Sequence, residues 1–278
     1  MAGKLYVVAT PIGNLGDFSP RAVETLNSVD FIAAEDTRVG ARLLSHFGIG
    51  KPQVSYFEHN RKAKGDYIAD RIEAGENCAI ITDAGTPAIS DPGTDLVALC
   101  AARGIQVVGV PGCSAVVTAL SVSGMDTGRF TFEGFLSTNN KNRREHLEEV
   151  RNEKRTMVFY EAPHKLLRTL EDMLAAWGDR SIALCRELTK MYEEVRRTTL
   201  AEAVEYYREN APRGEFVLVI GGCTAPAQPE DPVDLLAEVG QRIEDGMSLM
   251  SAVKEVSRLH NSPKNALYRQ ALERFGNE

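Results

Sequence analysis

The loop from Thr82 to Gly93, T-D-A-G-T-P-A-I-S-D-P-G, gathers carboxylates, hydroxyls and glycines in one short stretch. It follows the apolar run 78–82, which is typical of a buried strand, and precedes residues 94–103, whose apolar spacing is helical. Gly85 and Gly93 can adopt positive φ and let a ligand approach the backbone. Loops of about a dozen residues are uncommon in compact domains unless they bind something. The stretch predicts a ligand-binding loop, with a long surface turn as the alternative.

Three further polar segments follow predicted strands. Glu35-Asp-Thr-Arg38 comes after strand 30–34, Pro111–Ala115 comes after strand 105–110, and Glu161–Lys165 comes after strand 156–160. In an open α/β sheet, ligands bind in the crevice beyond the carboxyl ends of the strands. These segments therefore predict the walls of one cleft, although a salt-bridged loop or a polar helix start would look the same.

Five predicted strands, 4–10, 30–34, 54–57, 78–82 and 105–110, alternate with helices over residues 4–123. This alternation predicts an α/β fold with a parallel, doubly wound sheet. The loops carry neither a G-x-G-x-x-G dinucleotide fingerprint nor a Gly-Lys-Ser/Thr phosphate loop. A nucleotide site of either common type is therefore not expected.

The second half of the chain predicts a mixed sheet and then a helical region. Strands are expected at 130–136, 156–160, 182–185 and 214–221, with an antiparallel strand at 195–199. Three helices follow, the last two spaced like a helix-turn-helix, with Ser262 as the cap of the last one. The expected divisions are an N-terminal α/β domain (1–124), a C-terminal α/β domain (125–223), a proline-rich linker (224–232) and a helical region (233–278).

Composition narrows the possible classes. The net charge of −7 argues against RNA binding through the whole surface, and the five cysteines lack any C-x-x-C pair, so neither a disulfide scaffold nor a zinc site is expected. The uncharged stretch 104–125 is broken by Pro111-Gly112, which favours strand, turn and helix over a membrane span. No signal-peptide pattern is visible, and the scattered thiols are typical of a reducing cytosol.

Two mildly basic stretches could contact RNA. Residues 141–155 carry six Lys or Arg against four Glu, and residues 248–278 carry five against three. Solvated surface is the alternative for the first stretch, and dimer packing or a lid for the second. The candidate RNA-binding residues are Lys141, Arg143, Arg144, Lys254, Lys264 and Arg269.

Six ordered motifs together resemble one family. They are A-T-P-I-G-N-L-G-D at 9–17, E-D-T-R at 35–38, T-D-A-G-T-P-A-I-S-D-P-G at 82–93, V-P-G-C-S-A at 110–115, F-Y-E-A-P-H-K at 159–165 and G-E-F-V-L-V-I-G at 214–221. This pattern is similar to the ribosomal RNA small subunit methyltransferase I group of the tetrapyrrole methylase superfamily, over essentially the whole chain.

The resemblance implies two α/β domains of tetrapyrrole-methylase type with S-adenosylmethionine in the cleft between them. It also implies 2′-O-methylation of a decoding-site cytidine in 16S rRNA, in the cytoplasm and by a homodimer. The cofactor contacts that it implies are Asp83, Ala84, Gly85, Pro87, Ser90, Asp91, Ser114, Ala115, Tyr160 and Gly214.

Methylation of a ribose hydroxyl needs a group that accepts the hydroxyl proton. The candidates on the predicted cleft are Glu35, Asp36, Glu161, His164 and Lys165, and no metal is required. Two rivals stay open: a methylase acting on a tetrapyrrole or another acceptor that is not RNA, and a non-catalytic RNA-binding assembly factor. The C-terminal helical region favours an RNA acceptor.

Overall fold

Five short apolar strands form the first sheet of the computed structural model, which describes residues 2–57, 61–224, 234–260 and 262–276. The strands are β1 (Lys4–Val8), β2 (Phe31–Ala34), β3 (Gln53–Ser55), β4 (Cys78–Ile81) and β5 (Gln106–Val110). They pair in the order β3-β2-β4-β1-β5, and every pair is parallel. The predicted parallel, doubly wound sheet is confirmed.

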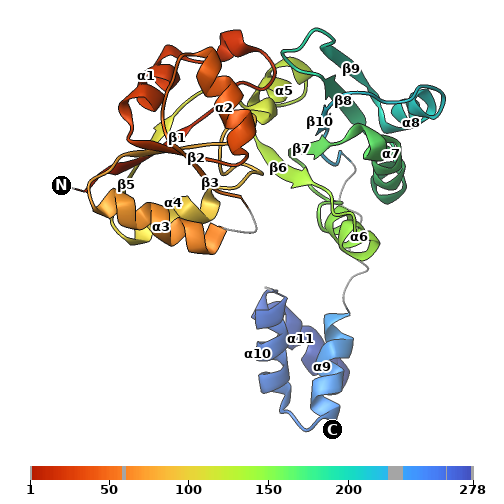
Figure 1. The fold of residues 1–278 in the computed structure, drawn as a ribbon. Coiled ribbons are helices and arrows are strands. Elements are labelled where there is room, and N and C mark those ends of the chain that lie inside the picture. Colours follow the sequence, from red (N-terminus) through yellow and green to blue (C-terminus); the bar gives the residue numbers. More distant parts are fainter. Residues whose placement is uncertain (1, 58–60, 225–233, 261, 277–278) are drawn as a thin grey trace. The chain divides into compact units, whose positions relative to one another are not determined.

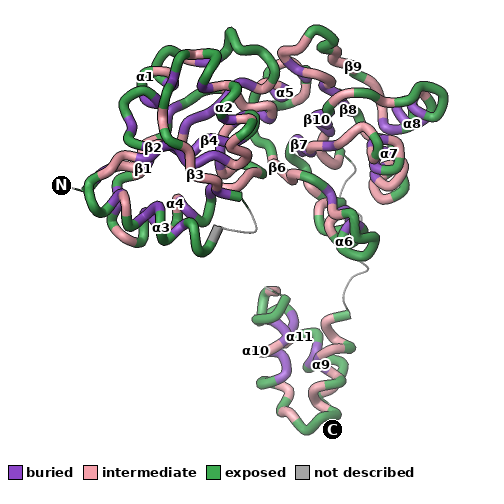
Figure 2. The backbone as a smooth tube through the Cα atoms, in the orientation of Figure 1, coloured by how far each residue is buried: buried purple, intermediate pink, exposed green. Residues whose placement is uncertain are grey.

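Helices cover both faces of this sheet, as a parallel sheet that is apolar on both sides requires. They are α1 (Pro20–Ser28), α2 (Thr37–His46), α3 (Arg61–Glu73) and α4 (Thr94–Ala102), with a short 3-10 helix at Leu15–Asp17. Figure 1 shows α1 and α2 on one side and α3 and α4 on the other, and each pair shares its own buried cluster with the strands. Figure 2 shows the buried strands between them.

The second sheet is mixed, as predicted. Its strands are β6 (Phe130–Phe135), β7 (Thr156–Glu161), β8 (Ser181–Arg186), β9 (Glu194–Thr199) and β10 (Phe216–Ile220), in the order β6-β7-β10-β8-β9. Only β6 and β7 pair in parallel, and the predicted strand at 195–199 pairs antiparallel with β8. One face carries α6 (Asn140–Glu149), α7 (Pro163–Trp177) and α8 (Leu200–Glu209).

Helix α5 (Ala115–Ser123) joins the two sheets. It follows β5 of the first sheet, yet its buried residues Val116, Ala119 and Leu120 pack against β8 and β10 of the second. The chain therefore crosses between the sheets at the loop that precedes α5. This crossing brings the carboxyl ends of the first-sheet strands close to the second sheet.

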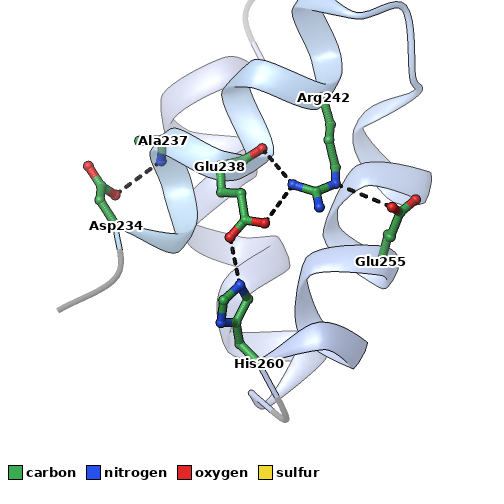
Figure 3. Close-up of polar contacts among 6 residues, drawn as sticks. All are labelled: Asp234, Ala237, Glu238, Arg242, Glu255 and His260. Atoms are coloured by element: carbon green, nitrogen blue, oxygen red, sulfur yellow. Dashed lines mark hydrogen bonds and ion pairs between the residues drawn. The ribbon is translucent and has the colours of Figure 1, made fainter. Parts of the chain in front are cut away.

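The residues after Cys223 form a separate compact unit. Helices α9 (Leu235–Glu244), α10 (Leu249–Leu259) and α11 (Lys264–Phe275) enclose a small core around Val239, Val253 and Val256. Polar contacts link α9 to α10, because Glu238 of α9 pairs with His260 at the end of α10 (2.6 Å) and Arg242 of α9 pairs with Glu255 of α10 (3.5 Å) (Figure 3). Glu238 and Arg242 also pair with each other within α9 (2.8 Å). The predicted linker lies outside the described residues apart from Thr224.

The predicted cap of the last helix is wrong. Pro263 is the N-cap residue of α11, and the buried Ser262 hydroxyl oxygen has no hydrogen-bond partner. Ser262 instead closes the preceding turn through its backbone, because its carbonyl accepts a hydrogen bond from the Ser257 hydroxyl (2.6 Å).

Candidate functional site

A cavity of about 540 Å³ lies within the unit Met1–Cys223, between loops of the two sheets. One wall comes from Ile12, residues 84–86 and 89–91, and residues 114–115. The facing wall comes from Phe135, residues 160–164, Cys185, Leu188, Lys190 and residues 215–217. Pockets of roughly 300–1,000 Å³ with mostly apolar walls and a few polar groups bind small molecules.

The loop 82–93 is fixed in place by its neighbours. Thr10 and Gly85 exchange backbone hydrogen bonds of 2.8 and 3.1 Å, and the Thr86 hydroxyl donates to the Cys113 carbonyl (2.9 Å). Gly85 has φ +85°, which a residue with a Cβ rarely adopts. Ala88 and Ser90 adopt left-handed backbone conformations, with φ of 69° and 62°. Such strained conformations persist only where the surrounding structure imposes them. The loop is therefore pre-shaped for a ligand.

Asp91 is the carboxylate that lines the first wall, and the charges of Glu35 and Asp83 act on it from outside the lining. Half-buried Asp91 lines the cavity, and burial, assisted by the charges of Glu35 and Asp83, raises its pKa to about 6. Burial and the charge of Glu35 also raise the pKa of Asp83. The Thr82 hydroxyl donates to Glu35 (2.5 Å), which holds that carboxylate at the end of β2. This wall favours a cationic ligand over an anionic one.

An aromatic group forms part of the second wall. The Tyr160 ring centroid lies 5.0 Å from that of Phe132 and 5.4 Å from that of Phe135. Burial raises the pKa of Tyr160 to about 12, so its hydroxyl stays protonated at neutral pH. Phe135 is 55% exposed and lines the cavity, where it offers a flat apolar surface to a ligand.

A charged cluster on the second wall was not predicted. The Lys190 ammonium donates to Glu187 and to Glu215, both at 2.9 Å. Burial alone would lower the pKa of Lys190, but these two hydrogen bonds outweigh burial and raise it. A Cβ at Gly13 would lie 2.5 Å from the Lys190 side chain, and one at Gly214 would lie 2.5 Å from that of Glu187. R-E-L-T-K at 186–190 follows a strand, which is the same signal that identified the other cleft segments.

Seven of the ten predicted cofactor residues line the cavity, and three do not. The lining residues are Ala84, Gly85, Ser90, Asp91, Ser114, Ala115 and Tyr160. Pro87 is buried inside the loop, and exposed Asp83 accepts a hydrogen bond from the Asp36 backbone (3.3 Å). Gly214, with φ +82°, lies behind the wall and gives room to Glu187.

The five candidate proton acceptors separate into two groups. His164 and Glu161 line the cavity, whereas Glu35, Asp36 and Lys165 are not among its lining residues. Glu161 is only 3% exposed, and its two oxygens accept hydrogen bonds from the Ala162 backbone (2.8 Å) and the Thr169 hydroxyl (2.5 Å). His164 is exposed at the start of α7. The geometry therefore leaves His164 as the accessible candidate.

The structure corrects one candidate RNA contact. Arg143 is 4% exposed and donates to Asp172 (2.6 Å) and to the Thr169 hydroxyl (3.0 Å), so its guanidinium fastens α6 to α7 inside the protein. Lys141 and Arg144 are exposed on α6. Lys254, Lys264 and Arg269 are exposed on α10 and α11 of the helical unit.

Neither a metal cluster nor a membrane-spanning helix occurs among residues 2–57, 61–224, 234–260 and 262–276. Among these residues, no three His, Cys, Asp or Glu side chains form a group that could hold a metal ion. Within the same ranges, no helix has the length and apolar character needed to cross a bilayer.

The architecture matches known methyltransferases. Residues 4–204 match the family model of Tetrapyrrole (Corrin/Porphyrin) Methylases. A cobalt precorrin-4 methyltransferase is similar over 78% of this chain and 94% of its own (TM-score 0.59, 18% identity), and a diphthine synthase over 79% and 90% (TM-score 0.60, 13% identity). The fold is the tetrapyrrole methylase fold, with its cavity between two α/β sheets.

Relatives that match over nearly the full chain identify one group within the tetrapyrrole methylases. Proteins named "Ribosomal RNA small subunit methyltransferase I" are 47% identical in Synechocystis sp. (98% of each chain), 45% in Pseudomonas aeruginosa (99% of each) and 43% in Escherichia coli O157:H7 (99% of this chain, 96% of that protein). The chain therefore belongs to the tetrapyrrole methylase family and, within it, to the ribosomal RNA small subunit methyltransferase I group.

Proposed function

We propose that this protein uses S-adenosylmethionine to methylate the 2′-hydroxyl of a decoding-site cytidine in 16S rRNA. The names of its full-length relatives support methylation of small-subunit ribosomal RNA. A structural neighbour, a uroporphyrin-III C-methyltransferase from Thermus thermophilus, is complexed with S-adenyl homocysteine (TM-score 0.56, 15% identity, 79% of this chain and 97% of that chain). The resemblance of the six motifs to the family supports the ribose 2′-hydroxyl as the methylated group and a cytidine as the modified nucleotide.

The acidic cavity between the two sheets is the observation that carries the proposal. S-adenosylmethionine combines a sulfonium cation with an adenine ring, a ribose and an amino-acid group. The Asp91 carboxylate can pair with the sulfonium charge or accept hydrogen bonds from the ribose hydroxyls. The apolar side chains of Ile12, Phe135 and Val217 can pack against the adenine ring. Ser114 and Ala115 offer backbone N–H groups at the start of α5. The residues present fit the donor, which supplies an electrophilic methyl group when bound.

The chain's own contribution is positioning and proton acceptance. The fixed loop 82–93 and the opposite wall hold the reacting groups in line, and most of the rate acceleration arises from such positioning. We assign proton acceptance to His164, because it is the accessible member of the candidate set that lines the cavity. Glu161 keeps the start of α7 in place instead, because both its oxygens already accept hydrogen bonds.

Replacing His164 with alanine is expected to lower the single-turnover rate constant of methylation about tenfold and to leave the donor Kd unchanged. General bases usually contribute more than this, but His164 is exposed and water can replace it in part. Single-turnover methylation and calorimetry measure the two quantities. A loss of donor affinity equal to the loss of rate would show that His164 binds the donor and does not accept the proton.

The exposed basic residues are proposed to contact the RNA backbone. Reversing the charges of Lys254, Lys264 and Arg269 together is expected to lower kcat/KM on small subunits about tenfold. The slope of log kcat/KM against log salt should also become less steep, because each lost phosphate contact removes roughly 0.7–0.9 from the slope. Reversing Lys141 and Arg144 gives the same test for α6. Unchanged activity and slope in both variants would contradict backbone contact by these faces.

Calorimetry with S-adenosylmethionine and transfer of tritium from the labelled donor to unmodified small ribosomal subunits test the proposal. Failure to bind the donor would leave an RNA-binding assembly factor, and label found only in a precorrin-like acceptor would leave a small-molecule methylase. The same proposal includes a homodimer and a cytoplasmic location. It also includes the divisions 1–124, 125–223, 224–232 and 233–278. The helix-turn-helix character of the last region is proposed with them.

A further inference from the structure

Arg38 is solvent-exposed but held in a defined orientation. Its side chain is 87% exposed, yet its Nε lies 3.0 and 3.2 Å from the two oxygens of Asp36, and a terminal nitrogen lies 2.7 Å from the second oxygen. Asp36 is fixed in turn, because it caps α2 by accepting from the Arg38 backbone N–H (2.8 Å). Hydrogen bonds from Arg38 hold the pKa of Asp36 well below its usual range, so the pair stays ionised.

This pair is joined to the loop that lines the cavity. The Asp36 backbone N–H donates to Asp83 (3.3 Å), and the neighbouring Glu35 accepts from the Thr82 hydroxyl (2.5 Å). Asp83 and Thr82 lie at the start of the loop 82–93. Ser90 and Asp91 of the same loop line the cavity. Arg38 itself is not a lining residue. Because its segment is hydrogen-bonded to the cavity loop, Arg38 lies on the same sheet edge as the cavity. Because it does not line the cavity, it lies outside the space for the donor.

The charges around Arg38 decide which ligand it suits. Glu35, Asp36 and Asp83 carry three negative charges against the one positive charge of Arg38, so this edge repels a phosphate. A neutral nucleobase meets no such repulsion. Unpaired RNA bases stack on the planes of arginine guanidinium groups. The pairing with Asp36 fixes that plane before the RNA arrives, so little side-chain entropy remains to be lost on binding.

We propose that Arg38 stacks on an unpaired base of the acceptor RNA beside the nucleotide that enters the cavity, with Asp36 as the residue that positions it. This inference rests on the proposed function, because it takes the acceptor to be RNA. It gives the E-D-T-R segment a role in acceptor recognition, separate from both the donor site and the proton transfer.

Substitution of Arg38 by lysine separates stacking from charge. The R38K variant keeps the positive charge and loses the plane, so kcat/KM on small subunits and affinity for fluorescent single-stranded RNA should both fall about tenfold. The salt slope and the donor Kd should stay at their wild-type values. Asp36→Asn, which can still cap α2, should cause a smaller loss of about threefold.

Arg208→Lys is the matched control, because Arg208 on α8 also pairs with a carboxylate, Glu171, at 62% exposure. It should leave every quantity unchanged. Wild-type kcat/KM and RNA affinity in R38K would overturn the proposal, as would an R38M variant whose salt slope falls by about one unit, the mark of a lost phosphate contact. If the wild-type protein binds RNA but labels no subunit, the proposed function fails, while weaker RNA binding by R38K still supports the base contact.

Discussion

Replacing Asp91 with alanine is expected to weaken S-adenosylmethionine binding about 100-fold, the largest loss of donor affinity for any single residue of the cavity. A hydrogen bond to a charged group is worth about 1.5–3 kcal/mol, or roughly 10- to 150-fold, and Asp91 is the half-buried carboxylate of the first wall. Calorimetry measures the change. Glu205→Ala, on an exposed position of α8, is the control and should bind as wild type does.

The pH dependence gives a second measure of the same contact. Because burial and neighbouring carboxylates raise the pKa of Asp91 to about 6, the group is ionised at pH 7.5 and becomes protonated as the pH falls through 6. Donor affinity should therefore fall about tenfold between pH 7 and pH 5, and this fall should be absent in Asp91→Asn. A pH-dependent loss of equal size in Asp91→Asn would assign the titration to another group.

Replacing Glu161 with alanine should lower the free energy of unfolding by about 2–4 kcal/mol, because it leaves buried hydrogen-bond donors without their acceptor. Glu161 is 3% exposed and accepts from Thr169, whose hydroxyl also accepts from buried Arg143. The loss should therefore extend to the packing of α6 against α7. Urea denaturation measures the change, and Glu161→Gln should recover part of it because the amide keeps an acceptor oxygen.

This variant also separates a structural role from a chemical one. If Glu161 only shapes the start of α7, Glu161→Gln should retain most of the methylation rate at a temperature where it is fully folded. A fully stable Glu161→Gln protein with no activity would contradict the structural assignment and return Glu161 to the set of proton acceptors.

The first sheet and most of the cavity wall could be predicted because their signals are local. Apolar runs followed by glycine-rich polar loops identify parallel strands and their carboxyl ends, and these ends meet at one edge in any doubly wound sheet. That rule predicts the loop 82–93 and the segment 111–115 at one edge of the first sheet. Tyr160, which lies on β7 of the second sheet, is implied only by the family resemblance.

The remaining features depend on contacts between distant residues. The pattern of α5 predicts an amphipathic or buried helix but not which sheet it covers, and it packs on the second sheet. Arg143 resembles its exposed neighbour Arg144 in sequence, yet it is buried because Asp172 and Thr169 lie opposite it on α7. The Lys190 cluster depends on Glu215, 25 residues away, and on the absence of a side chain at Gly13.

The most direct measurement combines tritium transfer with alkaline hydrolysis of the labelled RNA. The protein is incubated with tritiated S-adenosylmethionine and unmodified small ribosomal subunits, and the purified 16S rRNA is then hydrolysed. A methylated 2′-oxygen cannot attack the adjacent phosphate, so the label should appear in one alkali-resistant dinucleotide that contains cytidine. At a donor concentration near the wild-type Kd, Asp91→Ala should give only a small fraction of this label. Label in mononucleotides, which would indicate a methylated base, or no label in the RNA would contradict the account.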